Sequence, residues 1–319
     1  MPVIVAVVIP CFRVKNHILI VLSRIGTEVD RVFVIDDACP EGSGQLVQEQ
    51  CSDPRVTVIR HEVNQGVGAA VITGYAAALK EGAQIMVKVD GDGQMDPTLI
   101  PHFIAPILKG QADYTKGNRF YDLTRIGQMP AVRLLGNAAL SFMAKLSTGY
   151  WNLFDTTNGF TAIHAKAAKR IAFEKVSPRY FFETDLLFRL NTIRAVVVDI
   201  AMDASYGSET SNLRVTHVFG EFLVKHLRNF GKRVFYSYFL RDMTAASLEL
   251  AIGMCAVTFG MVFGGIHWLH SIGTGMPTPL GTIMLAALPT MLGMQLLLAF
   301  IAFDVANVPR RPIHLDLPG

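Results

Sequence analysis

The chain has 319 residues, of which 51% are hydrophobic and only 17% charged, and its formal net charge is +3. An average soluble domain has roughly 25% charged residues, and the mean hydropathy of +0.35 is high for a soluble enzyme and low for a polytopic transporter. These values exclude a disordered chain and an all-membrane bundle, and the small charge gives no indication of nucleic-acid binding. The four cysteines form no CxxC pair, which excludes a disulfide scaffold and indicates reduced thiols in a cytosolic setting.

The amino-terminal two thirds alternate short apolar runs with helical stretches. The apolar runs predict buried strands at Val3–Ile9, Val32–Ile35, Val56–Ile59 and Ile85–Val89, and the pattern of Gly68–Glu81 predicts a helix. This alternation is typical of an α/β domain with a mostly parallel sheet. Because such sheets bind ligands at the carboxyl ends of their strands, the residues that follow each strand are the site candidates.

Carboxylates follow two of these predicted strands. Asp36 and Asp37 end the second, and Asp90-Gly-Asp92-Gly-Gln94 ends the fourth. Oxygen ligands suit a hard cation, Mg²⁺ or Mn²⁺, that bridges to phosphates. A single Asp-x-Asp also occurs in solvated acidic turns, but the second acidic pair favours a metal site made of Asp90, Asp92 and Gln94. We expect the intervening glycine to let the backbone turn sharply.

A glycine-rich segment, Asn64-Gln-Gly66-Val-Gly68, follows the third predicted strand. Glycines permit close backbone approach to a ligand, so this loop is a candidate border of a nucleotide site. The alternative is a plain connection into the next helix.

The last part of the chain is strongly apolar. From Met243 to Phe303 the only formally charged residue is Glu249. Two stretches, at about 246–269 and 282–303, reach the roughly 20 apolar residues that a membrane helix needs. Buried core helices of a globular domain are the alternative, but such helices have a polar stripe and neither stretch has one.

Basic residues flank these two stretches and are absent from the connector between them. Five precede the first stretch and two follow the second: Lys225, Arg228, Lys232, Arg233 and Arg241, then Arg310 and Arg311. The positive-inside rule therefore predicts a multi-pass hairpin in the inner (plasma) membrane, with the catalytic domain and both termini cytoplasmic. Val3–Ile9 has no basic residues before it and is too short for a signal peptide.

Residues 213–242 combine apolar and aromatic side chains at three- and four-residue spacing with basic ones. This pattern predicts one or two amphipathic helices in the membrane interface, and the alternative is a helix packed on the catalytic domain. The predicted organisation is a catalytic domain at 1–212, interfacial helices at 213–242, and a hairpin with a short cytoplasmic tail at 243–319.

The order of the motifs resembles that of the family-2 glycosyltransferases of GT-A fold. It is most similar to the polyprenyl-phosphate glycosyltransferases related to dolichol-phosphate mannose synthase. The departures are Arg13-Val14, Ala38-Cys39 and Asp96, which lie around the expected nucleoside pocket and bear on the base and the sugar. The matching segments are Ile9-Pro10-Cys-Phe12, Val34-Ile-Asp-Asp37, Asn64–Gly68, Asp90–Pro97, Lys116-Gly-Asn-Arg119-Phe, Asp155-Thr-Thr-Asn-Gly159-Phe160 and Tyr206–Ser211.

The resemblance implies a membrane-bound inverting enzyme that moves one sugar from a nucleotide sugar, of the UDP-glucose or GDP-mannose type, to a polyprenyl phosphate. It also implies Mg²⁺ or Mn²⁺ as cofactor. The residues it assigns to the nucleotide sugar are Pro10, Phe12, Asp37, Gly66 and Asp90. An N-cap role is an equal alternative for Asp37.

The acceptor phosphate needs cationic partners, and Arg119 and Arg133 are the candidates because a guanidinium matches phosphate geometry. Asp155 matches the residue usually assigned as catalytic base, with Asp92 and Arg119 as the other catalytic candidates. A phosphate monoester has its second pKa near 6, however, so it is mostly ionised at neutral pH. We therefore expect Asp155 to position the acceptor or the sugar. The competing carboxylates, Glu183 and Asp185, could instead cap the following helix.

Two other functions are compatible with parts of the sequence. A synthase that elongates a glycan needs several spans and normally a QxxRW motif, and the sequence has neither. A membrane-tethered subunit that binds a nucleotide sugar without transferring it, as a sensor or as part of a flippase, would not need the metal signature. The sequence leaves the sugar, the nucleotide and a homo-oligomeric state open.

Overall fold

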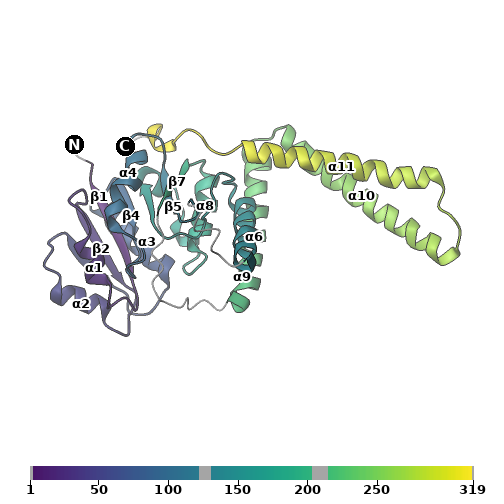
Figure 1. The fold of residues 1–319 in the computed structure, drawn as a ribbon. Helices are drawn as coiled ribbons and strands as arrows, with labels where there is room; N and C mark the ends of the chain where they lie inside the picture. Colours follow the sequence, from purple (N-terminus) through teal and green to yellow (C-terminus); the bar gives the residue numbers. More distant parts are fainter. Residues whose placement is uncertain (1–2, 122–130, 203–214, 318–319) are drawn as a thin grey trace. The chain divides into compact units, whose positions relative to one another are not determined.

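The computed structural model describes residues 3–121, 131–202 and 215–317 (Figure 1). The chain divides into two compact units. The first contains residues 1–230 and 309–319, and the second contains residues 231–308. The sequence analysis assigns 309–319 to the tail of the hairpin, whereas these residues pack with the first unit.

The first unit is built on a seven-stranded sheet with the order β3-β2-β1-β4-β6-β5-β7. Only β6 runs antiparallel to its neighbours, β4 and β5, so the prediction of a mostly parallel sheet is confirmed. The strands are β1 (Val5–Cys11), β2 (Arg31–Asp36), β3 (Val56–Arg60), β4 (Ile85–Lys88), β5 (Tyr114–Asn118), β6 (Thr161–His164) and β7 (Val197–Ala201). The first four match the predicted strands to within two residues at each end.

Helices cover both faces of the sheet. On one face, apolar side chains of α1, α2 and α4 join those of β1, β2 and β4 in one buried cluster. On the other face α3 packs so closely that a Cβ at Gly74 would lie 2.2 Å from Val8, and α8 contacts α3 and α6. The α-helices of this unit are α1 (Ile18–Ser23), α2 (Ser43–Gln50), α3 (Val67–Lys80), α4 (Ile100–Leu108), α6 (Ala131–Thr148), α7 (Ala165–Ala168) and α8 (Phe182–Thr192).

The predicted interfacial region forms α9 (Val215–Phe235) and a π-helical turn at Tyr236–Arg241. One side of α9 packs on the first unit, because His226 shares a hydrogen bond with Ser147 at 2.8 Å and Asn229 donates to Asp185 at 2.9 Å. Apolar side chains on another side are exposed, including Val224 and Leu227. The domain-packed alternative thus describes one face of α9, and a membrane-interfacial role of its exposed apolar side chains stays a prediction.

The second unit contains two helices that are long and apolar enough to cross a membrane, α10 (Ala245–Thr274) and α11 (Leu280–Ala306). Their most apolar windows are only 22% and 11% buried, whereas core helices of soluble proteins are mostly buried. Glycines let the two helices touch: a Cβ at Gly260 would lie 2.2 Å from Thr290, and one at Gly293 would lie 2.8 Å from the Gly253 carbonyl oxygen. Small residues at such contacts are typical of membrane helix pairs.

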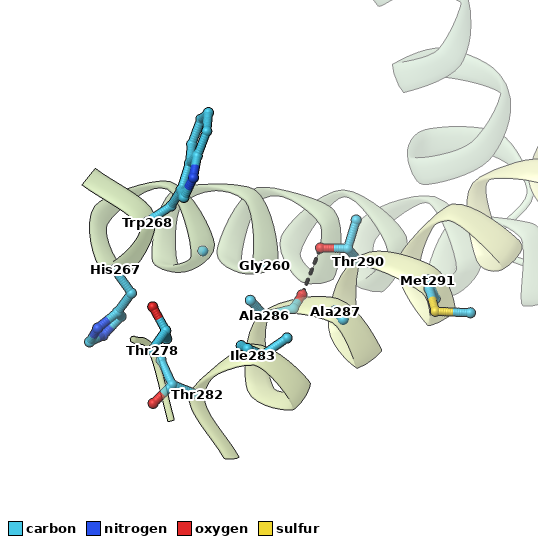
Figure 2. Close-up of a pocket in the computed structure, with 11 residues that line it drawn as sticks. Gly260, His267, Trp268, Thr278, Thr282, Ile283, Ala286, Ala287, Thr290 and Met291 are labelled. Carbon is cyan, nitrogen blue, oxygen red and sulfur yellow. Dashed lines mark hydrogen bonds between the residues drawn. The ribbon is translucent and has the colours of Figure 1, made fainter. Parts of the chain in front are cut away.

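A groove of about 510 Å³ opens between α10 and α11 (Figure 2). Its walls are mostly apolar, and Thr290 turns its hydroxyl back to the Ala286 carbonyl oxygen at 2.8 Å. His267 is the one lining residue with a titratable side chain. The groove therefore lacks the carboxylates and cations that sugar-transfer chemistry needs.

A buried ion pair ties the start of the second unit to its end. Arg233 donates to both carboxylate oxygens of Asp304, at 2.6 and 2.9 Å, and Tyr238 donates to the same carboxylate at 2.5 Å. All three residues are under 6% exposed. Because paired charges lose far less on burial than isolated ones, this contact fixes the last residues of α9 to the end of α11.

The segment after α11 returns to the sheet. Asp113, which is fully buried just before β5, accepts hydrogen bonds from the backbone of Val196, Ile313 and His314 and pairs with the His314 ring at 2.7 Å. The His164 ring stacks on the His314 ring at 4.3 Å. The chain that leaves the first unit after residue 230 is thus anchored in it again from residue 309.

Candidate functional site

The predicted site motifs meet at one edge of the sheet. β1, β2, β3 and β4 are parallel and end there, and β5 is parallel to them because β6 is antiparallel to both β4 and β5. The segment after β4, the segment after β5 and the segment before β6 therefore emerge together. Residues 90–94, Arg119 and 155–159 occupy these three positions.

Asp37 organises the loop that follows β3. Its carboxylate accepts hydrogen bonds from the backbone N–H of Gln65 (2.9 Å) and Gly66 (2.8 Å) and contacts the ring of His61 at 2.7 Å. Gly66 has φ +99° and is the N-cap of α3, and a Cβ there would lie 2.5 Å from the Pro178 carbonyl oxygen. Asp37 thus holds the glycine-rich loop in place and does not cap α2, whose N-cap is Gly42.

Two of the three departures from the family pattern, Arg13-Val14 and Ala38-Cys39, touch each other. The Arg13 N–H donates to the Cys39 sulfur at 3.1 Å, and both Arg13 (φ +57°) and Ala38 (φ +51°) have left-handed backbone. The predicted pocket residue Phe12 is 40% exposed, and the Arg13 guanidinium lies 5.4 Å from its ring centroid. Pro10 is half-buried in β1 beside them. The unusual residues therefore form one local unit at the end of β1.

The sharp turn of the Asp90–Gln94 segment lies one glycine later than the sequence analysis expects. Gly93 has φ +77°, whereas Gly91 has no positive φ, and a Cβ there would lie 3.2–3.3 Å from apolar side chains of the core. Gly91 therefore packs tightly against the core and does not make the turn. The turn lets the Asp92 carboxylate accept a hydrogen bond from the Gln94 N–H at 3.0 Å.

Asp90 lies beside a buried lysine that the sequence analysis missed. Lys88 Nζ is 2.9 Å from Asp90 Oδ1 and 3.0 Å from Glu183 Oε1. Its side chain is 1% exposed. Although burial alone would lower the pKa of Lys88, the two carboxylates raise it, so this side chain is a cation. The signal in the sequence was a charged residue at the end of an otherwise apolar strand.

Arg119 and Asp155 form a bidentate pair. Nε donates to Oδ2 at 2.7 Å and Nη2 to Oδ1 at 3.0 Å, and the Arg119 N–H also donates to Oδ2 at 3.2 Å. Asp155 is 2% exposed. Burial alone would raise its pKa, but the hydrogen bonds and charge of Arg119 lower it below its usual value. The sequence assigned these two residues to separate steps, and the structure brings them together.

Two further titratable groups lie under this pair. Lys116 is fully buried, donates to the Asn158 carbonyl oxygen, and burial lowers its pKa to about 8. Asp199 accepts a hydrogen bond from Asn118 at 3.1 Å, while its Oδ1 accepts none within the described part of the chain. Burial raises the pKa of Asp199 to about 6. The position of Asp199 beside Asn118 could not be read from the sequence, because β7 pairs with β5 only in the tertiary fold.

The competing carboxylates are both engaged. Glu183 binds Lys88, and Asp185 accepts hydrogen bonds from the Ser177 N–H and from Asn229, both at 2.9 Å. The side chain of Arg133, in α6, and the motif at 206–211 lie outside the described residues.

The acidic segment after β4 has the oxygen donors that a divalent cation prefers. Asp90 Oδ1 is buried beside Lys88 Nζ, at 2.9 Å, and accepts no hydrogen bond among the described residues. Asp92 and Gln94 follow on the same turn. No three His, Cys, Asp or Glu side chains converge in the described ranges. The two carboxylates of Asp90 and Asp92 fit Mg²⁺ or Mn²⁺, since Mg²⁺ is commonly held by one or two carboxylates and completed by substrate phosphates and water.

Comparison with known proteins gives a consistent result. The model of the family described as glycosyl transferase family 2 matches residues 6–172, just over half of the chain. The chain is 27% identical over 229 residues to the UDP-N-acetylglucosamine–dolichyl-phosphate N-acetylglucosaminyltransferase of Methanococcus voltae, covering 67% of this chain and 90% of that protein. It is 27% identical to the undecaprenyl-phosphate mannosyltransferase of Micrococcus luteus, covering 61% and 81%.

A solved structure shares the fold. Glucosyl-3-phosphoglycerate synthase from Mycobacterium tuberculosis, solved with Mn²⁺, uridine diphosphate and glucosyl-3-phosphoglycerate, superposes with a TM-score of 0.55 at 17% identity. The match covers 72% of this chain and 80% of that one.

Proposed function

Because the chain belongs to glycosyl transferase family 2, and is therefore a glycosyltransferase, we propose that it transfers one sugar from a nucleotide sugar to a polyprenyl phosphate, with inversion, at the cytoplasmic face of a membrane. The observation that carries the proposal is the contact between two motifs. A Cβ at Gly159, in the segment that begins with Asp155, would lie 2.3 Å from Asp90 Oδ2. The expected donor and acceptor motifs are thus in van der Waals contact.

On the donor side, Pro10, Phe12, Asp37 and Gly66 border the nucleotide. The exposed ring of Phe12 offers a stacking surface for the base. Asp90, Asp92 and Gln94 would hold Mg²⁺ or Mn²⁺, which supplies positive charge to stabilise the diphosphate leaving group. The Mn²⁺ and uridine diphosphate in the fold neighbour support this class of donor and cation.

On the acceptor side, Arg119 supplies positive charge toward the lipid phosphate, with Arg133 as a second candidate. Asp155 accepts from Nε and Nη2, along one edge of the Arg119 guanidinium, and fixes its plane, so a phosphate meets a preorganised cation. The lowered pKa of Asp155 makes it a weak proton acceptor, which supports positioning over general-base catalysis. The names of the Methanococcus voltae and Micrococcus luteus relatives support a polyprenyl-phosphate acceptor.

The two apolar helices would hold the enzyme where such a lipid lies. Residues before α10 and after α11 pack in one compact unit, which supports a hairpin whose two flanks lie on the same side of the membrane. The basic flanks then make that side cytoplasmic. A reporter fused after Gly319 should be active in the cytoplasm, and activity only on the opposite side would contradict the hairpin.

The test is transfer of label into lipid. Membranes containing the protein are incubated with radiolabelled UDP-glucose, GDP-mannose or UDP-N-acetylglucosamine, and the lipid fraction is extracted with solvent. We expect label in a mild-acid-labile lipid with one of these donors, and none above background with an Asp92→Asn variant. Label in a polymer would support a synthase. Nucleotide-sugar binding without any transfer would support a binding subunit.

A further inference from the structure

The buried lysine at the end of β4 has no assigned role in the site. The Lys88 side chain is 1% exposed and its ammonium lies between two carboxylates that are far apart in sequence, Asp90 and Glu183. Burying an ammonium group is costly, and replacing buried ion pairs by apolar residues is often neutral or stabilising. A charge at this position is therefore poorly explained by stability alone.

The geometry connects Lys88 to the acidic segment. Nζ is 2.9 Å from Asp90 Oδ1 as an ion pair outside hydrogen-bond geometry, and it donates a hydrogen bond of 3.0 Å to Glu183. Gly159 leaves the space for this arrangement, since a Cβ there would lie 2.5 Å from Nζ and 2.3 Å from Asp90 Oδ2. Asp90 is thus confined by a cation on one side and by backbone on the other.

We propose that Lys88 is a positioning residue for Asp90, and that Glu183 is the counter-charge that holds Lys88. The inference rests on the proposed function. Its chemical consequence is twofold: Asp90 keeps one orientation toward the nucleotide diphosphate, and one positive charge offsets the two aspartates that an anionic diphosphate must approach. Glu183 is therefore not the base of the transfer, because its Oε1 is committed to Lys88.

The central variant is the double substitution Lys88→Met with Glu183→Gln, in the full chain purified in detergent. It removes one charge of each sign, so neither Lys88 nor Glu183 is left buried and unpaired. Asp90 loses its contact with Lys88 Nζ, but its side chain is 27% exposed and can be rehydrated. Lys80→Met, at the exposed end of α3, is the matched control for loss of a lysine. Calorimetry measures the affinity for Mn²⁺ in the presence of UDP or GDP, whichever the wild type binds, and transfer assays give the apparent KM for Mn²⁺ and kcat.

We expect the double variant to melt near the wild-type temperature but to bind Mn²⁺ about 10- to 100-fold more weakly, the usual cost of removing a group that orients a metal ligand. Its KM for Mn²⁺ should rise by a similar factor, while kcat at saturating Mn²⁺ changes far less. A double variant that is folded and binds Mn²⁺ as the wild type does would overturn the inference. So would a loss of kcat and melting temperature with unchanged Mn²⁺ affinity, which is the result of a purely structural role.

The single substitution Glu183→Gln distinguishes a counter-charge role of Glu183 from a role as general base. The amide oxygen can still accept from Lys88, so we expect a loss of less than about tenfold, against the 10²–10⁴ that removal of a general base costs. A larger loss would contradict the assignment of Glu183. The two proposals fail in different assays. If the proposed function is wrong, the wild type produces no labelled lipid, whereas the Mn²⁺ titrations test Lys88 without requiring transfer.

Discussion

Asp155→Asn is the substitution that distinguishes a positioning carboxylate from a general base. The change removes a charge that is 2% exposed and puts an amide N–H₂ against one of the Arg119 nitrogens. Breaking a fully buried ion pair costs 3–5 kcal/mol. Since the Arg119 side chain is 28% exposed and can be rehydrated, we take the lower end, about 3 kcal/mol.

That loss should be measurable as a lower melting temperature. For a unit of this size, about 3 kcal/mol corresponds to about 6–12 °C. The contribution depends on pH with a definite sign. A carboxyl whose folded pKa is lowered stabilises the fold above its unfolded pKa, near 4, and this stability is lost as pH falls through the folded pKa. The contribution of Asp155 itself should thus be constant above about pH 5.5 and shrink in stronger acid. The comparison is made near pH 7, between the pKa of Asp199, about 6, and that of Lys116, about 8, because both groups interact with the Asp155 charge. Glu49→Gln, on the exposed side of α2, is the control.

Activity is measured between about pH 5.5 and 8.5 by single-turnover transfer. Misplacing the Arg119 guanidinium by about 1 Å is enough to lose about 10²-fold in rate, and the ratio of wild-type to variant rate should not change with pH. The result that would refute this reasoning is a defect that fades steadily between about pH 5.5 and 8.5. A base becomes dispensable as the acceptor phosphate, with its pKa near 6, ionises by itself.

Three further substitutions test other parts of the structure. Asp92→Asn should abolish transfer in a folded, membrane-bound protein, because loss of a metal-ligand charge costs several kcal/mol of transition-state stabilisation; near-normal turnover at saturating Mn²⁺ would contradict it. Asp304→Asn leaves Arg233 buried without its counter-charge and should destabilise the second unit by about 3 kcal/mol. The measurement is the melting temperature in detergent, and an unchanged melting curve would show that the Arg233–Asp304 pair does not stabilise this unit. Asp113→Asn weakens the hydrogen bonds that hold the backbone of Ile313 and His314, and it should speed tryptic cleavage after the exposed Arg310. Equal protection of wild type and variant would show that the segment is held by other contacts.

Much of the fold could be predicted from the sequence because its signals are local. A buried parallel strand is a continuous apolar run, so four strands and α3 were located to within two residues. The two membrane-length helices were equally plain, although α10 continues five residues beyond the predicted end at Leu269. The order of the site motifs along the chain also indicated the family, and the first four motifs lie at the ends of the four predicted strands.

Local sequence patterns do not predict which side chains from distant segments contact each other. Lys88 and Glu183 are 95 residues apart, and Asp113 and His314 are 201 apart, so no spacing rule links them. Asp155 and Arg119 were both found, but as separate groups, because only the antiparallel placement of β6 between β4 and β5 brings their segments together. The sequence by itself determined which elements form and which chemistry they have. The pairing of charges in the low-dielectric interior, and with it the protonation and orientation of each site residue, was decided only by the tertiary structure, because electrostatic interactions depend on distance in space and on burial.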